Sequence, residues 1–230
     1  MSIALKISLI FILAIQCKSV EENNQVEEDW AETQQSREYS NYAKFIQNHP
    51  KSEHFEKALS EYLFLADSVA DFIGCGKYDT SISIVDNEKI LFDDELKSID
   101  SLRFLTFDYL KNGIPNVSTH KYEVQIPQSK IKDSISKVHF GIGIYNKPFP
   151  IKPLKLAMEE ISIGINYYKE YLSEKWFDLP YNKLTKEKKF GIDNLNDKRV
   201  SFFDFSYMKG KKINPSPPSE FDINEEDSEE

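Results

Sequence analysis

The spacing of apolar residues first changes at the "GCG" of residues 74 to 76. Before that point apolar residues recur every three or four positions, which is typical of helices. Directly after it they alternate with polar residues, as in a strand with one buried face. Helical spacing then returns twice further along the chain. A chain that switches period in this way is neither all-helical nor all-β, so the sequence predicts an α+β fold.

Residues 38–73, before this switch, predict an α-hairpin. A first helix ends at "NHPKS", because Pro50 disfavours helical geometry at the residue before it, and Ser52 offers an N-cap for a second helix. The second helix has one apolar face, made by Phe55, Ala58, Leu59, Tyr62, Leu63, Ala66 and Val69. The pair resembles one tetratricopeptide-like unit, and a single unit cannot bury its apolar face alone. We therefore expect it to pack on the next domain, on a second copy or on a partner.

Residues 77–210 predict a small sheet with two helices on one face, in the order β-β-α-β-α-β, with an optional edge strand at "KYEVQI". The stretch 79–92 reads as a hairpin with a turn at Asp86-Asn87, and 95–113 reads as a helix that ends at Gly113. In "SKVHFGIGIYNK" Val138, Phe140, Ile142 and Ile144 share one face. A long helix then has a heptad-like seam, formed by Leu154, Met158, Ile161, Ile165, Tyr168 and Leu172. A turn, a short helix and a last strand at "RVSFFDFSYMKG" follow.

The two ends of the chain predict export and a charged tail. Residues 1–16 have one charge, Lys6, and an apolar run much shorter than the roughly 20 residues that span a bilayer, as in a signal peptide. "LAIQC" resembles a lipobox, although Gln16 stands where a small residue is usual, so we expect Cys17 to be lipidated. Ordinary cleavage and an uncleaved anchor are the alternatives. Residues 17–37 predict an acidic, solvated tether, with a helix towards Trp30 as the alternative, and residues 211–230 predict a disordered acidic tail.

Composition excludes several functional classes. The net charge of -9 and the pI of about 5.1 make nucleic-acid binding improbable. Cys75 reads as a turn residue, and a disulfide with Cys17 is the alternative that a lipid would exclude. His49 and His54 share an acidic loop and read as surface residues rather than a zinc site. Neither a nucleophile motif nor a phosphate-binding loop is present in the sequence, so we expect no catalytic residues, no metal and no cofactor.

Two stretches carry a resemblance to a known family. "KILFDDELKSIDSLRFLTFDYL" and especially "INYYKEYLSEKWFDLPYNKLTKEKK" resemble the periplasmic domain of the ExbD/TolR family, in its branch with an enlarged domain. The likeness covers about residues 77–208, and it implies a domain that dimerises and contacts TonB-like or Pal-like partners. The chain departs from the family at its N-terminus, which has no transmembrane helix with a proton-carrying Asp. It also has "YNKPFP" at a turn of the family pattern, and it adds the α-hairpin.

These observations predict a non-catalytic envelope lipoprotein that faces the periplasm or is displayed at the surface. It would be a partner-binding or accessory component of an ExbB–ExbD–TonB-type system. Its expected partners are an ExbB-, ExbD- or TonB-like component, a peptidoglycan-linked protein of the envelope, or a second copy of the chain. The alternative is a tetratricopeptide-type assembly lipoprotein unrelated to energy transduction. The predicted binding residues are Phe140, Gly141, Gly143 and Tyr145, on an unpaired strand edge that could accept a partner strand. The competing interpretation is that these glycines only make room for packed helices.

Overall fold

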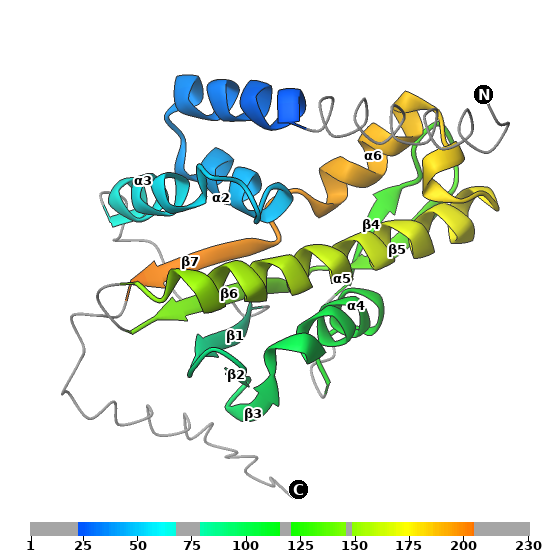
Figure 1. Cartoon of the computed structure of the whole chain (residues 1–230). Coiled ribbons are helices and arrows are strands. Elements are labelled where there is room, and N and C mark those ends of the chain that lie inside the picture. The colour runs from blue at the N-terminus through cyan, green and yellow to red at the C-terminus, as the bar shows by residue number, and fades with distance from the viewer. Residues whose placement is uncertain (1–22, 68–78, 116–120, 146–148, 205–230) are drawn as a thin grey trace, which may run out of the picture.

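The computed structural model describes residues 23–67, 79–115, 121–145 and 149–204 (Figure 1). Residues 23–36, called here the N-terminal helix, are followed by the helices α2 (Tyr39–Asn48), α3 (Phe55–Asp67), α4 (Leu102–Asn112), α5 (Ile151–Phe177) and α6 (Lys186–Asn196), with short 3₁₀ turns η2 (Ile99–Ser101) and η3 (Tyr181–Lys183). The strands are β1 (Asp79–Ile84), β2 (Lys89–Phe92), β3 (Glu95–Ser98), β4 (Lys121–Gln125), β5 (Lys132–Ser136), β6 (His139–Ile144) and β7 (Val200–Asp204). The predicted α+β class is confirmed.

The main sheet is mixed and has the strand order β3-β2-β1-β6-β7. The first three strands form an antiparallel meander, whereas β1, β6 and β7 run parallel to one another. The parallel pairs require crossovers, and these are the segments that contain α4 and then α5 with α6. A separate two-stranded antiparallel sheet is formed by β4 and β5.

Two strands differ from the sequence expectation. Residues 95–98 were expected to begin the helix of 95–113, but they form β3 and pair with β2, so Leu96 is 58% exposed rather than part of an apolar helical face. Strand β5 was not expected, because "KDSIS" has a single large apolar residue. It pairs with β4, the edge strand that the sequence did suggest.

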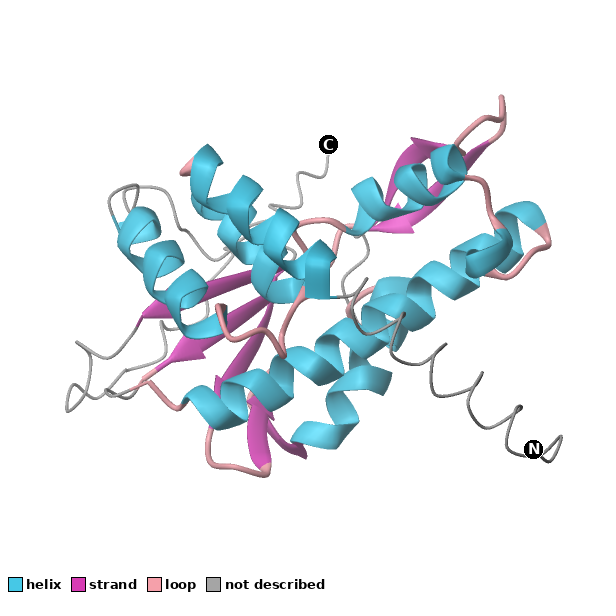
Figure 2. Cartoon of the chain, turned by 45° about the horizontal axis from the view of Figure 1, so that its top comes forward, coloured by secondary structure: helices cyan, strands magenta, loops and turns pink. Residues whose placement is uncertain are grey.

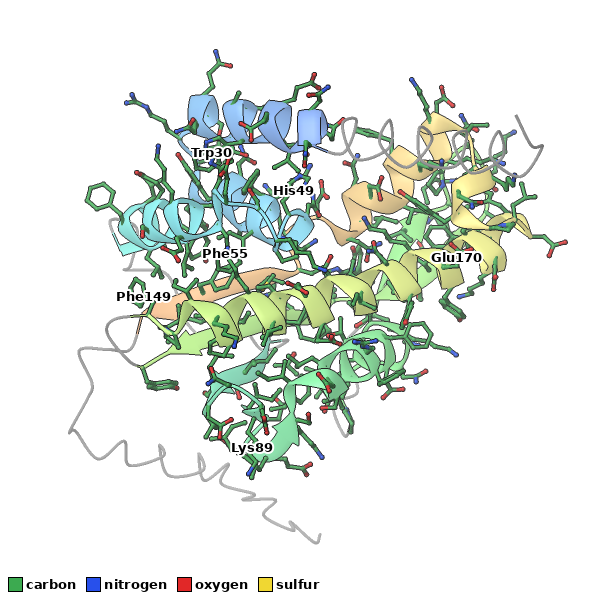
Figure 3. The ribbon with its side chains drawn as sticks, viewed as in Figure 1. Trp30, His49, Phe55, Lys89, Phe149 and Glu170 are labelled. Carbon is green, nitrogen blue, oxygen red and sulfur yellow. The ribbon has the colours of Figure 1, made fainter. Side chains whose placement is uncertain are left out.

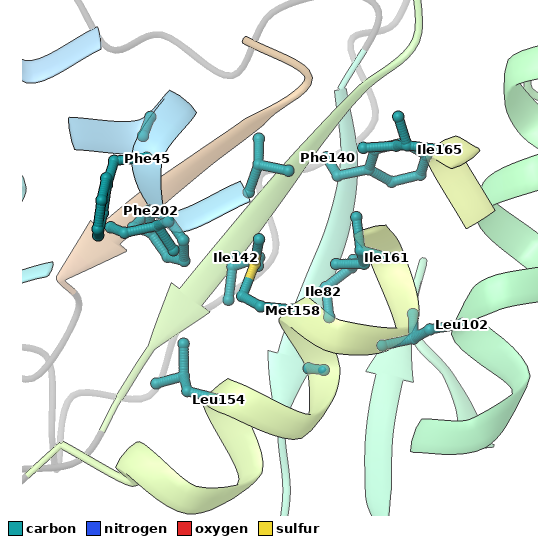
Figure 4. Packing of buried hydrophobic residues seen from close by; sticks show 14 of the residues in the cluster. Phe45, Ile82, Leu102, Phe140, Ile142, Leu154, Met158, Ile161, Ile165 and Phe202 are labelled. Atoms are coloured by element: carbon teal, nitrogen blue, oxygen red, sulfur yellow. The ribbon is translucent and has the colours of Figure 1, made fainter. Parts of the chain in front are cut away.

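A row of apolar side chains crosses one face of the main sheet and forms the base of the core. Phe92, Ile82, Ile142 and Phe202 stand opposite one another on successive strands. Four helices cover this face: α5 lies over the middle of the sheet, α4 lies beside it, and α2 and α3 lie over β7 (Figure 2). Figure 4 shows Met158 and Ile161 of α5 pointing toward this layer. All six residues of the predicted seam on α5 are buried, which confirms that seam.

The crossing of α4 and α5 depends on one glycine. A Cβ placed on Gly164 of α5 would lie 2.5 Å from the carbonyl oxygen of Arg103 and 2.6 Å from Cβ of Thr106. These distances are shorter than side chains tolerate, so the two helices approach as closely as they do because residue 164 has no side chain. The Arg103 guanidinium also pairs with the Glu160 carboxylate one turn earlier on α5. This ion pair closes the same crossing.

The α-hairpin packs on the sheet domain, which is one of the three arrangements that the sequence allows. The ring of Tyr62 in α3 meets that of Phe202 edge-to-face at 5.4 Å, and its hydroxyl accepts the backbone N–H of Phe202. Gln47 of α2 is buried, and its side chain bonds the carbonyl oxygen of Asn196 and the backbone N–H of Arg199, both at 3.0 Å. The hairpin is therefore a layer of this fold rather than a separate unit.

The solvated tether expected over residues 17–37 is wrong for its described part. Residues 23–36 form a helix that lies along α2 and α3, and Trp30 is only 6% exposed (Figure 1). The composition is acidic because the outer face of this helix is solvated, while one aromatic residue fixes the inner face. Residues 1–22, which include Cys17, lie outside the described part of the chain. Cys75 and the predicted tail at 211–230 lie outside it too.

The free strand edge expected at residues 136–145 is also wrong. Strand β6 pairs with β1 on one side and with β7 on the other, so its main-chain groups are used within the sheet. A Cβ on Gly141 would meet the ring of Phe203 at 2.9 Å. The glycine therefore accommodates a side chain of the neighbouring strand, which is close to the simpler interpretation of these glycines. Strand addition at Phe140, Gly141, Gly143 and Tyr145 loses its geometric basis.

Candidate functional site

A hollow lies where the N-terminal helix meets the turn between α2 and α3 and the middle of α5. We call it the interhelical pocket, and its volume is about 410 Å³. Apolar carbons and a few polar groups line it, from Gln25, Val26, Asn48, His49, Pro50, Lys51, Ser52, Glu159, Ser162 and Ile163. The turn residues reach it because Pro50 ends α2 and turns the chain back toward α5.

The wall between the turn and α5 is held by two lysines. The Lys51 ammonium lies 3.4 Å from a carboxylate oxygen of Glu159. The Lys155 ammonium donates to the carbonyl oxygen of Ser52 at 3.2 Å and lies 5.4 Å from the ring centre of Phe55. These contacts fix the turn on α5, so the hollow is a preformed feature of the helical layer.

His49 stands between this pocket and a second, smaller hollow of about 170 Å³ on its other side. Its Nε2 lies 2.7 Å from Oδ2 of Asp29 on the N-terminal helix. Across the turn between α2 and α3, Nε2 of His54 lies 3.0 Å from Oε1 of Glu27. Two histidines of the hairpin thus bond two carboxylates of the N-terminal helix, and they connect the two elements at the rim of the pocket.

Trp30, on the side of the N-terminal helix that faces the hairpin (Figure 3), completes this connection with an aromatic cluster. Its indole stacks on the imidazole of His54 with ring centres 4.8 Å apart and an interplanar angle of 8°. Phe45 and Tyr42 of α2 contact it at 5.1 and 6.1 Å between ring centres. The Lys57 ammonium lies 5.6 Å from the indole centre, where the electron-rich ring attracts a cation. The indole is the main apolar contact between the N-terminal helix and the hairpin.

Three side chains at the same rim could hold a divalent cation. One ligand atom from each of Glu27, Glu53 and His54 lies within 4.8 Å of the others. One imidazole nitrogen and two carboxylate oxygens suit zinc or a similar ion. Both glutamates are exposed, and the direct bond between His54 and Glu27 already accounts for two of the three side chains. The bond between His54 and Glu27 therefore accounts for this grouping of side chains without a metal ion.

A histidine paired with an aspartate in a hollow also raises the question of catalysis. A nucleophilic mechanism would need a hydroxyl or thiol bonded to the other imidazole nitrogen. Among the described residues, no serine, threonine or cysteine side chain makes such a bond to His49. The hydroxyl of Ser52, which lines the same pocket, instead accepts the backbone N–H of His54 at 3.0 Å.

A second polar cluster lies buried at the joint between α2, β5 and β7. Arg199 is 5% exposed, and its Nη1 donates to the carbonyl oxygens of Ser136 and Val138 at 3.0 and 3.1 Å. Burial lowers the pKa of its guanidinium, and the nearby hydroxyls of Tyr122 and Tyr168 oppose that shift. Its bonds to main-chain carbonyls close the end of the sheet, so we assign this residue a structural role.

The structure does not bring the sequence-predicted site residues to the interhelical pocket. Phe140, Gly141 and Gly143 are buried in the central strand β6, and Tyr145 is half-buried just beyond its end. The pocket residues were not anticipated as a site. The available signal was weak: two histidines five positions apart in a loop, and a lone tryptophan flanked by acids in a polar segment.

Comparison with models of protein families, with curated protein sequences and with solved structures finds no significant match to this chain. The ExbD/TolR resemblance therefore depends on the sequence stretches alone. Within the described residues, no helix is both long enough and apolar enough to span a bilayer.

Proposed function

We propose that this chain is a lipid-anchored, non-catalytic binding protein of the bacterial cell envelope, and an accessory component of an ExbB–ExbD–TonB-type system. The lipid is attached at Cys17, and the domain binds an envelope protein through the interhelical pocket. The docking of the N-terminal helix is the observation that supports this proposal most. It makes the membrane-proximal segment part of the folded domain and one wall of the pocket.

Chain length places the pocket near the membrane if Cys17 bears the lipid. Six residue steps separate Cys17 from the start of the N-terminal helix at residue 23, and they span at most about 20 Å. Gln25 and Val26, at the start of that helix, line the pocket. A partner that binds there would therefore meet the domain close to the bilayer, where membrane-embedded motor components present their periplasmic segments.

The tetratricopeptide-type adaptor is less well supported. Such adaptors bind partners with the inner faces of stacked helix pairs. Here Trp30 packs against Phe45 of α2, and Tyr62 of α3 packs against Phe202 of the sheet. The apolar faces of the hairpin are thus used within the chain. The described residues also form two sheets, which a helical adaptor would not need.

Site-specific crosslinking in the living cell tests the proposal. A photoreactive amino acid replaces Ser162, which lines the pocket, and in a matched control it replaces Asn166, which is exposed one turn further along α5. We expect position 162, and not position 166, to capture one discrete envelope protein of the ExbB, ExbD or TonB type. Equal labelling at the two positions, or none at either, would show that the pocket is not the binding site.

A further inference from the structure

The end of the molecule formed by the β4–β5 turn and the start of α6 differs in charge from the rest. We call residues 126–132 and 181–191 the distal tip. These two segments hold six lysines and one acidic residue, Glu187, whereas the whole chain has a net charge of -9. The excess of positive charge is therefore local, and the overall acidity of the chain conceals it.

The two segments of the distal tip lie against each other in the fold. A Cβ placed on Gly191 of α6 would lie 2.2 Å from Cγ of Pro127 in the β4–β5 turn. The turn itself is closed by a backbone bond from the N–H of Ile126 to the carbonyl oxygen of Ile131. The lysines that flank Ile131 are thus held beside those at the start of α6, and the tip is an ordered surface.

Several of these lysines form no ion pair with a described carboxylate, although Lys186 lies next to Glu187. Lys130, Lys183 and Lys186 are exposed and make no ion pair with any described residue, whereas Lys132 pairs with Glu123 at 2.5 Å. Lys188 and Lys189 lie over the rings of Phe177 and Tyr181. Charges left unpaired at one end of an acidic protein attract an anionic surface, and ordinary surface ion pairs do not neutralise them.

Two large apolar side chains project from the same tip. Ile131 is 67% exposed in the turn, and Phe190 is 66% exposed on α6. Lysines around exposed aliphatic and aromatic side chains are the combination that binds the interface of an anionic bilayer, where the cations meet headgroups and the apolar groups enter the acyl boundary. A nucleic acid or an acidic peptide would use the lysines but would not need the isoleucine.

The anchor and the distal tip can reach the same bilayer. Gln25 of the N-terminal helix borders the interhelical pocket together with Ile163 of α5, and fourteen residues of helix, about 21 Å, separate Ile163 from the end of α5 at Phe177. The six residue steps from Cys17 span a similar distance. Figure 1 shows the N-terminal helix beginning at its end nearer α6.

From these observations we infer that the distal tip docks on an anionic lipid surface, and that it forms a second membrane contact besides the anchor. The inference depends on the proposed lipid at Cys17 only for the orientation of the domain relative to the bilayer. The charge and the exposed apolar side chains of the tip would bind an anionic bilayer without it.

The test measures the partition of the full chain into vesicles of neutral phosphatidylcholine and into vesicles that contain phosphatidylglycerol. The N-terminal segment contributes to both, so the ratio of the two partition coefficients isolates the anionic preference. Reversing Lys130, Lys183 and Lys186 to Glu should lower that ratio by at least about tenfold, since each lysine near an anionic surface contributes roughly fivefold. High salt should abolish the preference in the parent chain.

The matched control reverses three exposed lysines away from the tip, Lys89, Lys111 and Lys152, so that the net charge changes equally. Its ratio should stay within about twofold of the parent. A second variant, Ile131→Ser with Phe190→Ser, should weaken binding to anionic vesicles while keeping its salt dependence. If reversal of the tip lysines leaves the ratio unchanged, or if the control lowers it equally, the membrane contact is refuted. An acidic segment of a partner protein would then be the ligand that the tip lysines fit. Failure of Cys17 lipidation would change neither ratio, so the two ideas fail separately.

Discussion

Replacing Trp30 with alanine tests whether the N-terminal helix belongs to the domain. The indole is 6% exposed and contacts three rings, at 4.8, 5.1 and 6.1 Å between centres. A buried tryptophan removes about 150–250 Å² from water, which corresponds to about 4–6 kcal/mol, and Trp→Ala changes in cores cost about 3–5 kcal/mol. The bonds of His49 to Asp29 and of His54 to Glu27 would remain, but such partly exposed contacts contribute only up to about 1 kcal/mol each.

The loss should be local because this helix is at the edge of the fold and the remaining core is intact. We expect the helix to undock, so that amide hydrogens of residues 23–36 exchange at least about 100-fold faster, while those of β6 keep their protection. Hydrogen exchange read by mass spectrometry measures both segments at once. Gln34→Ala, at an exposed position of the same helix, is the control and should change exchange by no more than about threefold. Unchanged protection of residues 23–36 in the Trp30 variant would refute the docking.

Three further predictions concern the domain. Ile161→Ala should lower the free energy of unfolding by about 2–5 kcal/mol in urea, and Asn166→Ala on the same helix by less than about 0.5 kcal/mol. Gly164→Ala should cost about 1–3 kcal/mol, because the added methyl group forces α4 away from α5; a neutral effect would mean that the crossing relaxes freely. Burial raises the pKa of Asp133, but hydrogen bonds from the last turn of α5 outweigh it and leave that pKa below its usual value. Its contribution is thus present above the unfolded-state pKa of about 3.9 and lost as pH falls through the lower folded value, so Asp133→Asn should destabilise most above about pH 5 and progressively less as the pH falls below that unfolded-state value.

Long periodic segments were predictable from the sequence because their spacing repeats over several turns. The seam of α5 is one such segment, and the β1–β2 hairpin, with alternating apolar residues and an Asp-Asn turn, is another. Both were confirmed by burial and pairing. Their patterns reflect a single requirement, a continuous buried face, which local sequence records directly.

Short polar strands were not predictable. Strand β3 is "ELKS" and β5 is "KDSIS", and each is held mainly by main-chain bonds to one neighbour. Such pairing depends on the partner strand and leaves little trace in side-chain pattern. The central position of β6 depends on β7, which follows about sixty residues later. The sequence of β6, "HFGIGI", has no charged residue. Such a continuous run is typical of a strand that is buried on both faces, as interior parallel strands are.

The candidate site was the least predictable part. Its walls come from the N-terminal helix, the turn at Pro50 and the middle of α5, which follows the other two by more than 100 residues. Periodicity assigns each segment to a helix or turn but does not say which ones meet. The acidic composition of residues 23–36 favoured a solvated tether, and a single tryptophan was too small a signal to oppose it.

The central claim is that the chain is anchored through Cys17 next to a docked N-terminal helix. The most direct test is the intact mass of the native protein after extraction from the membranes of its host. The account predicts a chain that begins at Cys17 and carries a diacylglyceryl group on sulfur and an acyl chain on the amino group. An unmodified Cys17, or a chain that still contains residues 1–16, would contradict it.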